Sequence, residues 1–523
     1  MFRLNTNLLF MILIIGGLLP GCTKGKNMQT LSKKLLRINF EEGDPPSLHP
    51  HMGTDYRSRI LVTSLYEGLT RLDTQGIPQL AAAEKIDVSD SGTIYTFTLR
   101  PHNWSNGSPV TAFQFESAWK KALAPDSGCV RAELFYPLKN AEKAKTGAIP
   151  LEEIGVKALS SKILRVELEH PTSYFLNLTA TSLYSPLYDE STEPIDFNGP
   201  YLIDSWKRDQ SLCLVANPLY WDKEAIQLHK IEISLICDSL TTLTLFEKGE
   251  LDWIGSPFGC IPKEAIPSLE AAHLLKNKEI ARIYCIYCNV NIFPLHSPKI
   301  RQALSYAINR NALTQHILIG RSPTHTPLPN NLTLLQKEPF LLEADIKKAK
   351  SLFEEGLAEL GLTMETFPIL TLSYSHSLGG HKQLAELLQQ YWSDALGVKV
   401  KLKNTEWNVL FSDLQQGQFQ LGMCCNTAFY NNPFYYLEQF KEPNGINFSR
   451  WEHTGYISLI DQAISLSDLQ KQHILLKEAE QILHEEMPII TLCTEQSQYV
   501  TQEDIRAALN DLGCVDFKWV HRS

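Results

Sequence analysis

The chain has 523 residues, of which 44% are hydrophobic and 20% charged, and its formal net charge is −10. Such a length is sufficient for about two to four domains with large cores. The high hydrophobic and moderate charged content excludes a disordered protein. The acidic balance, without clusters of lysine and arginine, excludes a nucleic-acid partner.

The N-terminal segment predicts export and lipidation. Leu8 to Leu19 is an apolar run without a charged residue, too short for a membrane span of about 20 residues but typical of a signal peptide. "LPGC", which ends at Cys22, resembles a bacterial lipobox, so we expect residues 1–21 to be removed and Cys22 to be lipidated. Residues 22–34 then form a lysine-rich tether. The alternative is an ordinary signal peptide whose cysteine is incidental.

Strands and helices are predicted in mixed order along the first half of the mature chain. Apolar alternation predicts strands, and apolar residues three and four apart predict helices. The expected strands are 35–40, 93–100 and 164–171, and the expected helices are a short one around 60–65 and one over 112–123.

The second half predicts a β-α-β unit. Strand patterns at 367–375 and 398–404 flank a helical pattern at 381–396, which places the two strands parallel in one sheet. Near the C-terminus an amphipathic helix is followed, after Pro488, by another strand.

Eleven cysteines leave the redox state open, because an exported chain meets an oxidising compartment. Cys285 and Cys288 have the spacing of a metal half-site, but their β-forming neighbours predict a strand. Residues three apart on a strand point to opposite faces, so we expect two buried cysteines and no metal. Pairing of Cys424 or Cys425 with another cysteine stays open.

Several motifs resemble those of the extracytoplasmic oligopeptide-binding proteins that serve ABC importers. They are residues 64–123, "NGPYLIDSW" at 198–206, "NPLYWD" at 217–222, "GELDW" at 249–253, "IRQALSYAINR" at 300–310 and "LGVKVKLKNTEW" at 396–407. The resemblance implies an α/β fold: a three-domain, type II periplasmic-binding-protein-like clamshell with mixed sheets and a β-rich insertion domain. The expected boundaries are 35–66, 198–283 and 495–523 for domain I, 67–197 for domain II and 284–494 for domain III.

The resemblance also implies a binding protein without catalytic turnover, a cofactor or a metal. It would capture short peptides between domains I and III and pass them to ABC transporter permease subunits, held at the membrane by its N-terminal lipid. No G-x-S-x-G, H-E-x-x-H, Walker or dinucleotide-binding motif occurs in the sequence, so nothing in it favours an enzyme.

One stretch departs from the family pattern. Typical members hold the peptide's α-ammonium with an aspartate in a stretch like "WCADYNEP", whereas this chain has "NTAFYNNP" at 426–433. Asn426, Thr427 and Phe429 stand where the tryptophan, the cysteine and the aspartate would be. A phenyl ring cannot replace a carboxylate, and an unpaired buried ammonium costs several kcal/mol.

Other candidate ligand-binding residues also follow from the resemblance. Leu414 and Met423 stand where members carry arginines and Ile317 where they carry a lysine, while His381 and Trp407 match the family residues. Core packing is the alternative for Trp407, Phe429 and Met423, and helix capping or a solvent-facing position for His381. Arg131 is expected at the surface.

The weakened charged contacts predict altered recognition of the cargo's ends. The alternatives are a modified peptide, a cell-wall fragment, a metal chelate, haem or an oligosaccharide on the same fold, or a surface lipoprotein that does not transport.

Overall fold

The structure, a computed structural model, describes residues 34–53, 55–188, 196–336, 342–376, 380–443, 446–466 and 468–523. Residues 1–33, with the predicted signal peptide and Cys22, lie outside the described residues. Within the described ranges, no helix combines the length and the apolar character that a membrane span requires.

The lower body is built on a four-stranded sheet in the order β1-β10-β9-β8, in which only β1 and β10 run parallel. The predicted strand at 35–40 forms β1, and the short helix α2 packs on β8. The bounds are Leu35–Asn39 (β1), Tyr56–Leu65 (α2), Tyr201–Lys207 (β8), Ser211–Ala216 (β9), Lys230–Ser234 (β10), Ser239–Glu247 (α6) and Ile266–Ala271 (α7).

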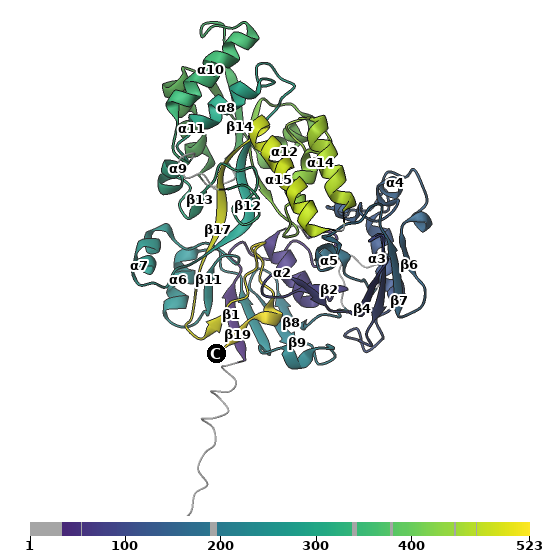
Figure 1. The fold of residues 1–523 in the computed structure, drawn as a ribbon. Helices are drawn as coiled ribbons and strands as arrows, with labels where there is room; N and C mark the ends of the chain where they lie inside the picture. Colours follow the sequence, from purple (N-terminus) through teal and green to yellow (C-terminus); the bar gives the residue numbers. More distant parts are fainter. Residues whose placement is uncertain are drawn as a thin grey trace, which may run out of the picture.

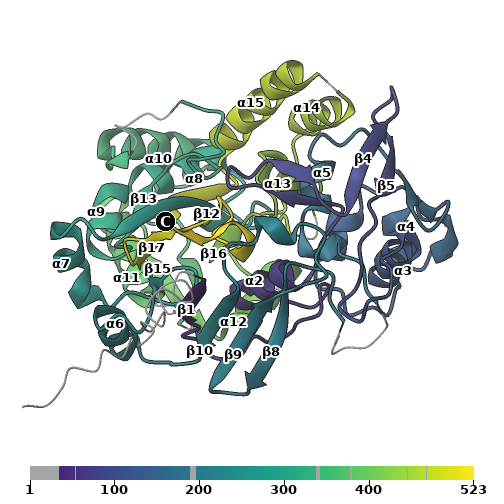
Figure 2. The ribbon, with the colours of Figure 1, turned by 90° about the horizontal axis from the view of Figure 1, so that it is seen from below.

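A β-rich unit lies to one side of this body (Figure 2). Its antiparallel sheet has the order β4-β5-β7-β6, and α3 packs on it. The predicted strands at 93–100 and 164–171 form β5 and β7, and the predicted helix at 112–123 forms α3. The elements are β2 (Thr70–Leu72), β3 (Pro78–Leu80), β4 (Ala83–Val88), β5 (Ile94–Leu99), α3 (Ala112–Ala122), α4 (Ala141–Lys145), β6 (Val156–Ala158), β7 (Ile163–Glu167) and α5 (Phe175–Thr179).

The upper lobe is built on a seven-stranded sheet in the order β11-β17-β12-β16-β14-β15, with β13 paired to β17. Strands β14 and β15 are parallel, which confirms the prediction from the β-α-β pattern. The strands are β11 (Trp253–Gly255), β12 (Lys276–Cys288), β13 (Arg321–Pro323), β14 (Leu370–Ser375), β15 (Val400–Thr405), β16 (Leu421–Thr427) and β17 (Ile489–Thr501).

Helices cover both faces of this sheet. Ile286 and Met423 face a core shared with α8 to α11, whereas Ile283 and Cys424 face a core shared with α12, α14 and α15. The bounds are Pro298–Tyr306 (α8), Arg310–His316 (α9), Ile346–Leu360 (α10), His381–Leu396 (α11), Trp407–Gln416 (α12), Phe434–Leu437 (α13), Thr454–Ser465 (α14) and Leu469–Glu486 (α15).

Two long strands connect the lobes. Strands β12 and β17, each 13 residues long, run antiparallel from the upper lobe into the lower body (Figure 1). Their pairing is interrupted by register shifts between Glu279 and Ile283 and between Tyr284 and Cys285. The predicted domain boundaries at 283/284 and 494/495 fall within these two strands, beside the irregular pairing.

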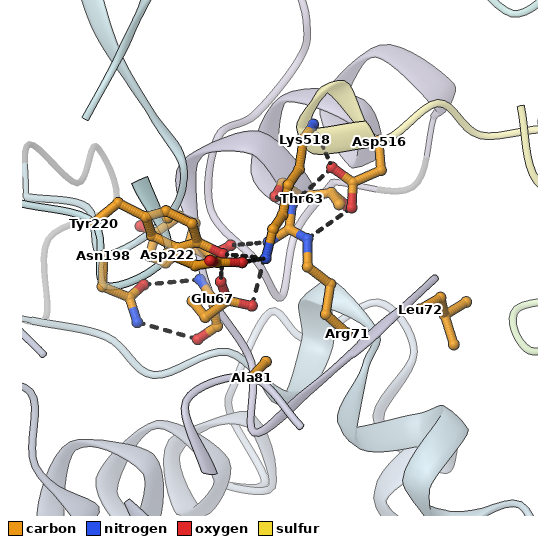
Figure 3. Close-up of polar contacts among 12 residues, drawn as sticks. Thr63, Glu67, Arg71, Leu72, Ala81, Asn198, Tyr220, Asp222, Asp516 and Lys518 are labelled. Atoms are coloured by element: carbon orange, nitrogen blue, oxygen red, sulfur yellow. Dashed lines mark hydrogen bonds and ion pairs between the residues drawn. The ribbon is translucent and has the colours of Figure 1, made fainter. Parts of the chain in front are cut away.

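The C-terminal segment is fixed to the lower body by a buried polar network (Figure 3). Arg71 donates to both carboxylate oxygens of Asp516 at 2.7 and 2.8 Å and to Glu67 at 3.3 Å. Lys518 forms an ion pair with Asp222 at 2.8 Å and donates to the hydroxyl of Tyr220 at 3.0 Å. The short pair of β18 (Ile505–Arg506) and β19 (His521–Arg522) ends this segment. Three distant parts of the chain thus form one rigid base.

Candidate functional site

A large cavity lies between the lower body and the upper lobe. Its volume is about 1170 Å³, above the range of about 300–1000 Å³ that is usual for small-molecule pockets. The lining residues come from the turn before α2, from α2, from the β11–α7 connection, from β12, α12 and β16, and from the segment that follows β16. Arg131 adds the edge of the β-rich unit.

Aromatic side chains form much of the upper wall. Trp407 begins α12 directly after its N-cap Glu406, whose carboxylate accepts the backbone N–H of Asn408. The Trp407 ring lies 5.9 Å from that of Phe411, which in turn meets Phe448 edge to face at 5.8 Å. Trp407 is partly buried and lines the cavity, as its predicted role requires.

Two arginines lie close to the ring of Phe429. The guanidinium of Arg131 is 3.9 Å from the centre of the Phe429 ring, and that of Arg59 is 5.0 Å away. Arg131 also pairs with Glu133 and donates to the hydroxyl of Tyr435 at 3.3 Å. The expectation that Arg131 belongs to the surface is wrong, because these contacts hold it in the cavity wall. Two guanidiniums thus lie within 5.0 Å of the centre of the ring at position 429.

Asn426 and Thr427 end β16 and also line the cavity. The Asn426 amide donates to the side chain of Gln439 at 2.6 Å, so it is held by the fold. Thr427 is opposite Arg282 in the β12–β16 register. Of the predicted ligand-binding residues, the structure therefore brings Trp407, Phe429, Asn426 and Thr427 together.

Met423 and His381 lie elsewhere and are not among the residues that line this cavity. Met423 is 2% exposed and packs on the α8–α11 side of the sheet. His381 is 1% exposed at the start of α11, with its ring edge to face against Tyr284 at 5.8 Å. Burial lowers the pKa of His381 to about 4, so its ring is neutral. Ligand contact by these two residues stays a prediction without support from the cavity.

Two positions at which the resemblance implied a cation in other family members are in apolar surroundings here. Leu414 is fully buried, and Ile317 packs against the upper core.

Cys285 and Cys288 lie on β12, as predicted from their β-forming neighbours. Cys285 and Cys288 are buried on opposite sides of the seven-stranded sheet, which confirms the reasoning from strand periodicity. The ten cysteines among the described residues are free thiols. Cys425 lines the cavity, and its sulfur accepts from Arg282 at 3.1 Å.

The cavity also contains charged residues that were not predicted from the sequence: Glu41, Glu42, Asp55, Arg57, Arg59, Arg282 and Glu495. A signal existed for some of them, since Arg59 lies between the apolar positions of α2 and the acidic pair Glu41–Glu42 precedes a proline-rich turn. Their convergence could not be foreseen, because α2 and β12 are more than 200 residues apart in the chain.

Two lobes joined by crossing strands around a large cavity define a solute-binding protein of the clamshell type. Residues 77–448 match the family of bacterial extracellular solute-binding proteins, family 5 Middle. The chain is 36% identical to the oligopeptide-binding protein OppA of Bacillus subtilis (strain 168) over 494 residues, 91% of this chain and 90% of the relative. It is 30% identical to the dipeptide-binding protein DppE of the same organism over 533 residues, 97% of this chain and 96% of the relative.

A solved structure, that of the Escherichia coli murein tripeptide binding protein MppA, has the same fold. The TM-score is 0.77 at 24% identity, over 94% of this chain and 98% of that one. The chain therefore belongs to family 5 of the bacterial extracellular solute-binding proteins. This confirms the predicted family and fold class, and it confirms a binding protein rather than an enzyme.

Proposed function

We propose that this chain captures short peptides in the cavity between its lobes and delivers them unaltered to an ABC transporter, without the ammonium-binding carboxylate that the family resemblance implies. The relatives named as oligopeptide- and dipeptide-binding proteins support peptides as cargo. The cavity of about 1170 Å³ supports a ligand of several residues.

The observation that carries the proposal is the presence of both Arg131 and Arg59 close to the ring of Phe429. A free α-ammonium beside this ring would meet two guanidiniums and no carboxylate from residue 429. Since like charges repel and an unpaired buried charge is costly, a free amino end gains nothing at this position.

Isothermal titration calorimetry with trialanine, tetra-alanine and their N-acetylated forms tests this proposal. We expect the acetylated peptides to bind at least as tightly as the free amines. A preference for the free amine of tenfold or more, about 1.4 kcal/mol, would contradict it.

The cell location is also part of the proposal. Family membership supports an extracytoplasmic site of action, and the lipobox-like "LPGC" supports a lipid anchor on Cys22. Metabolic labelling with a clickable palmitate analogue should mark the wild-type protein and leave Cys22→Ser unlabelled. Labelling of that variant would refute the anchor. The division into domains at 66/67, 197/198, 283/284 and 494/495 belongs to the same proposal.

A further inference from the structure

Two arginines of the cavity form no ion pair among the described residues. Arg59, on α2, has only ring contacts there: Phe429 at 5.0 Å and Tyr56 at 5.9 Å. Arg282, on β12, donates to the sulfur of Cys425 at 3.1 Å and lies 5.5 Å from the ring of Tyr284. Both side chains are partly buried, and both line the cavity.

The other charged lining residues are already engaged. Arg57 pairs with Asp55 at 3.1 Å and with Glu42 at 3.4 Å. Glu41 accepts the backbone N–H of Cys260 at 2.5 Å, on the wall formed by residues 256–260.

Two further charged residues near Arg282 and Arg59 form ion pairs. Glu495, the acidic residue that acts on Arg282, pairs with Arg321 at 3.2 Å, and Arg131 pairs with Glu133. The lining arginines that form no ion pair within the described ranges are therefore Arg59 and Arg282, whereas Arg57 pairs with two carboxylates.

Two buried donors at the same wall lack acceptors. The Tyr56 hydroxyl and the Nε of Arg282 are shielded from water and have no hydrogen-bond partner within the described part of the chain. Burial raises the pKa of Tyr56, so its hydroxyl keeps the proton and can donate it, and the guanidinium of Arg59 lies 5.9 Å from the Tyr56 ring. A buried donor without an acceptor is unfavourable, and more so when it is charged.

We infer that Tyr56, Arg59 and Arg282 form a carboxylate-binding subsite for the peptide cargo. A carboxylate accepts two or more hydrogen bonds at once, and arginine provides them in a planar fork, so this group satisfies both the charge and the open donors. It can come from the peptide's C-terminus or from an acidic side chain. The inference rests on the proposed peptide-binding function and adds the chemical class of cargo that the cavity selects.

Four peptides separate these sources: N-acetyl-trialanine as the free acid and as the amide, and N-acetyl-Ala-Glu-Ala-amide with its Gln counterpart. Titrated into the purified full-length protein, at least one carboxylated member should bind tenfold or more tightly than its neutral partner. The first pair reports the C-terminus and the second pair an acidic side chain.

Arginine-to-glutamine variants test whether the preference for a carboxylated peptide arises from this subsite. Arg59→Gln should reduce the acid-to-amide affinity ratio to near one, and Arg282→Gln should do the same. Arg165→Gln, which removes the same charge from β7 outside the cavity, should retain the ratio. Because Arg282 lies in a core strand, Arg59→Gln on the partly exposed helix α2 is the decisive variant if Arg282→Gln misfolds.

The outcomes distinguish the two proposals. Binding of the peptides without a carboxylate preference, or a preference that survives in Arg59→Gln, would overturn the subsite and leave the peptide-binding function standing. Failure of every peptide to bind would overturn the peptide-binding function, and the subsite with it.

Discussion

Replacing Phe429 with aspartate tests whether the neighbouring arginines decide how the cavity treats a free amino end. With Arg131 at 3.9 Å and Arg59 at 5.0 Å from the ring centre, the new carboxylate would pair with them first. Two unit charges 4–5 Å apart interact by about 3–4 kcal/mol at an effective dielectric constant of about 20, before solvent screening. The aspartate alone would therefore be neutralised.

The net charge around residue 429 predicts how strongly each variant prefers a free amine to an N-acetyl group. Arg131, Arg59 and Glu133 sum to +1 in the wild type, to zero in Phe429→Asp, and to −1 in Phe429→Asp with Arg131→Gln, which also leaves Glu133 without its partner. The ratio of free-amine to N-acetyl affinity should be at or below one in the wild type, near one in the single variant, and tenfold or more in the double variant.

Calorimetry with trialanine and N-acetyl-trialanine measures this ratio in each protein, and Phe429→Asn controls for loss of the ring without a new charge. A tenfold preference for the free amine in Phe429→Asp alone would refute the argument, because the arginines would then not neutralise the carboxylate. A double variant without any preference would refute it equally.

Three further predictions concern the scaffold and the aromatic wall. Asp516→Asn should lower the free energy of unfolding by about 3 kcal/mol in chemical denaturation, since it leaves Arg71 with Glu67 as its remaining carboxylate partner. Burial raises the pKa of Glu480 to about 7, so the stability advantage of wild type over Glu480→Gln should fall by about 3 kcal/mol between pH 4.5 and 7 and stay level above. Trp407→Ala should weaken peptide binding about tenfold and leave the unfolding midpoint near that of wild type.

The direction in which the wild-type stability advantage changes with pH follows from the surroundings of Glu480. The side chain is fully buried on α15 and accepts from the hydroxyl of Thr333 and the backbone N–H of Leu334. Its pKa is higher in the folded state than the usual 4.5, so the folded state holds a proton that the unfolded state releases above pH 4.5. A wild-type advantage that rises with pH over this window would contradict the assignment.

Controls also exist for the other two variants. Glu503→Gln, in an exposed turn, should leave stability unchanged, and an equal loss there would show that Asp516 has no special role. An unchanged affinity in Trp407→Ala would show that Trp407 is packing rather than cavity wall.

Local periodicity predicted much of the fold. The helix at 381–396 has the predicted bounds because its apolar residues recur at helical spacing and glycine follows it at position 397 with a left-handed backbone. Cys285 and Cys288 were correctly placed on opposite faces for an equally local reason. The span of β12 and β17 across two lobes was not predictable, because no local pattern tells one sheet from two.

The cavity was less predictable than the fold. Matching single positions to relatives predicted Trp407 and Phe429 as ligand-binding residues, and both line the cavity, but Arg131 was wrongly assigned to the surface. Its role depends on the ring of Phe429, nearly 300 residues away, and on Tyr435. A sequence alone gives no signal for such a contact.

Helix α2 has buried apolar residues that pack in the core and an arginine, Arg59, that lines the cavity. Ile60, Leu61 and Leu65 are fully buried in the lower core, whereas Arg59 is directed to the cavity and has only ring contacts with the described residues. Replacing Arg59 therefore changes the potential of the cavity with little loss of core packing. Phe429 occupies a similar position after β16. Substitutions at residues 59 and 429 are therefore expected to change how the cavity meets the ends of a ligand while the fold is kept.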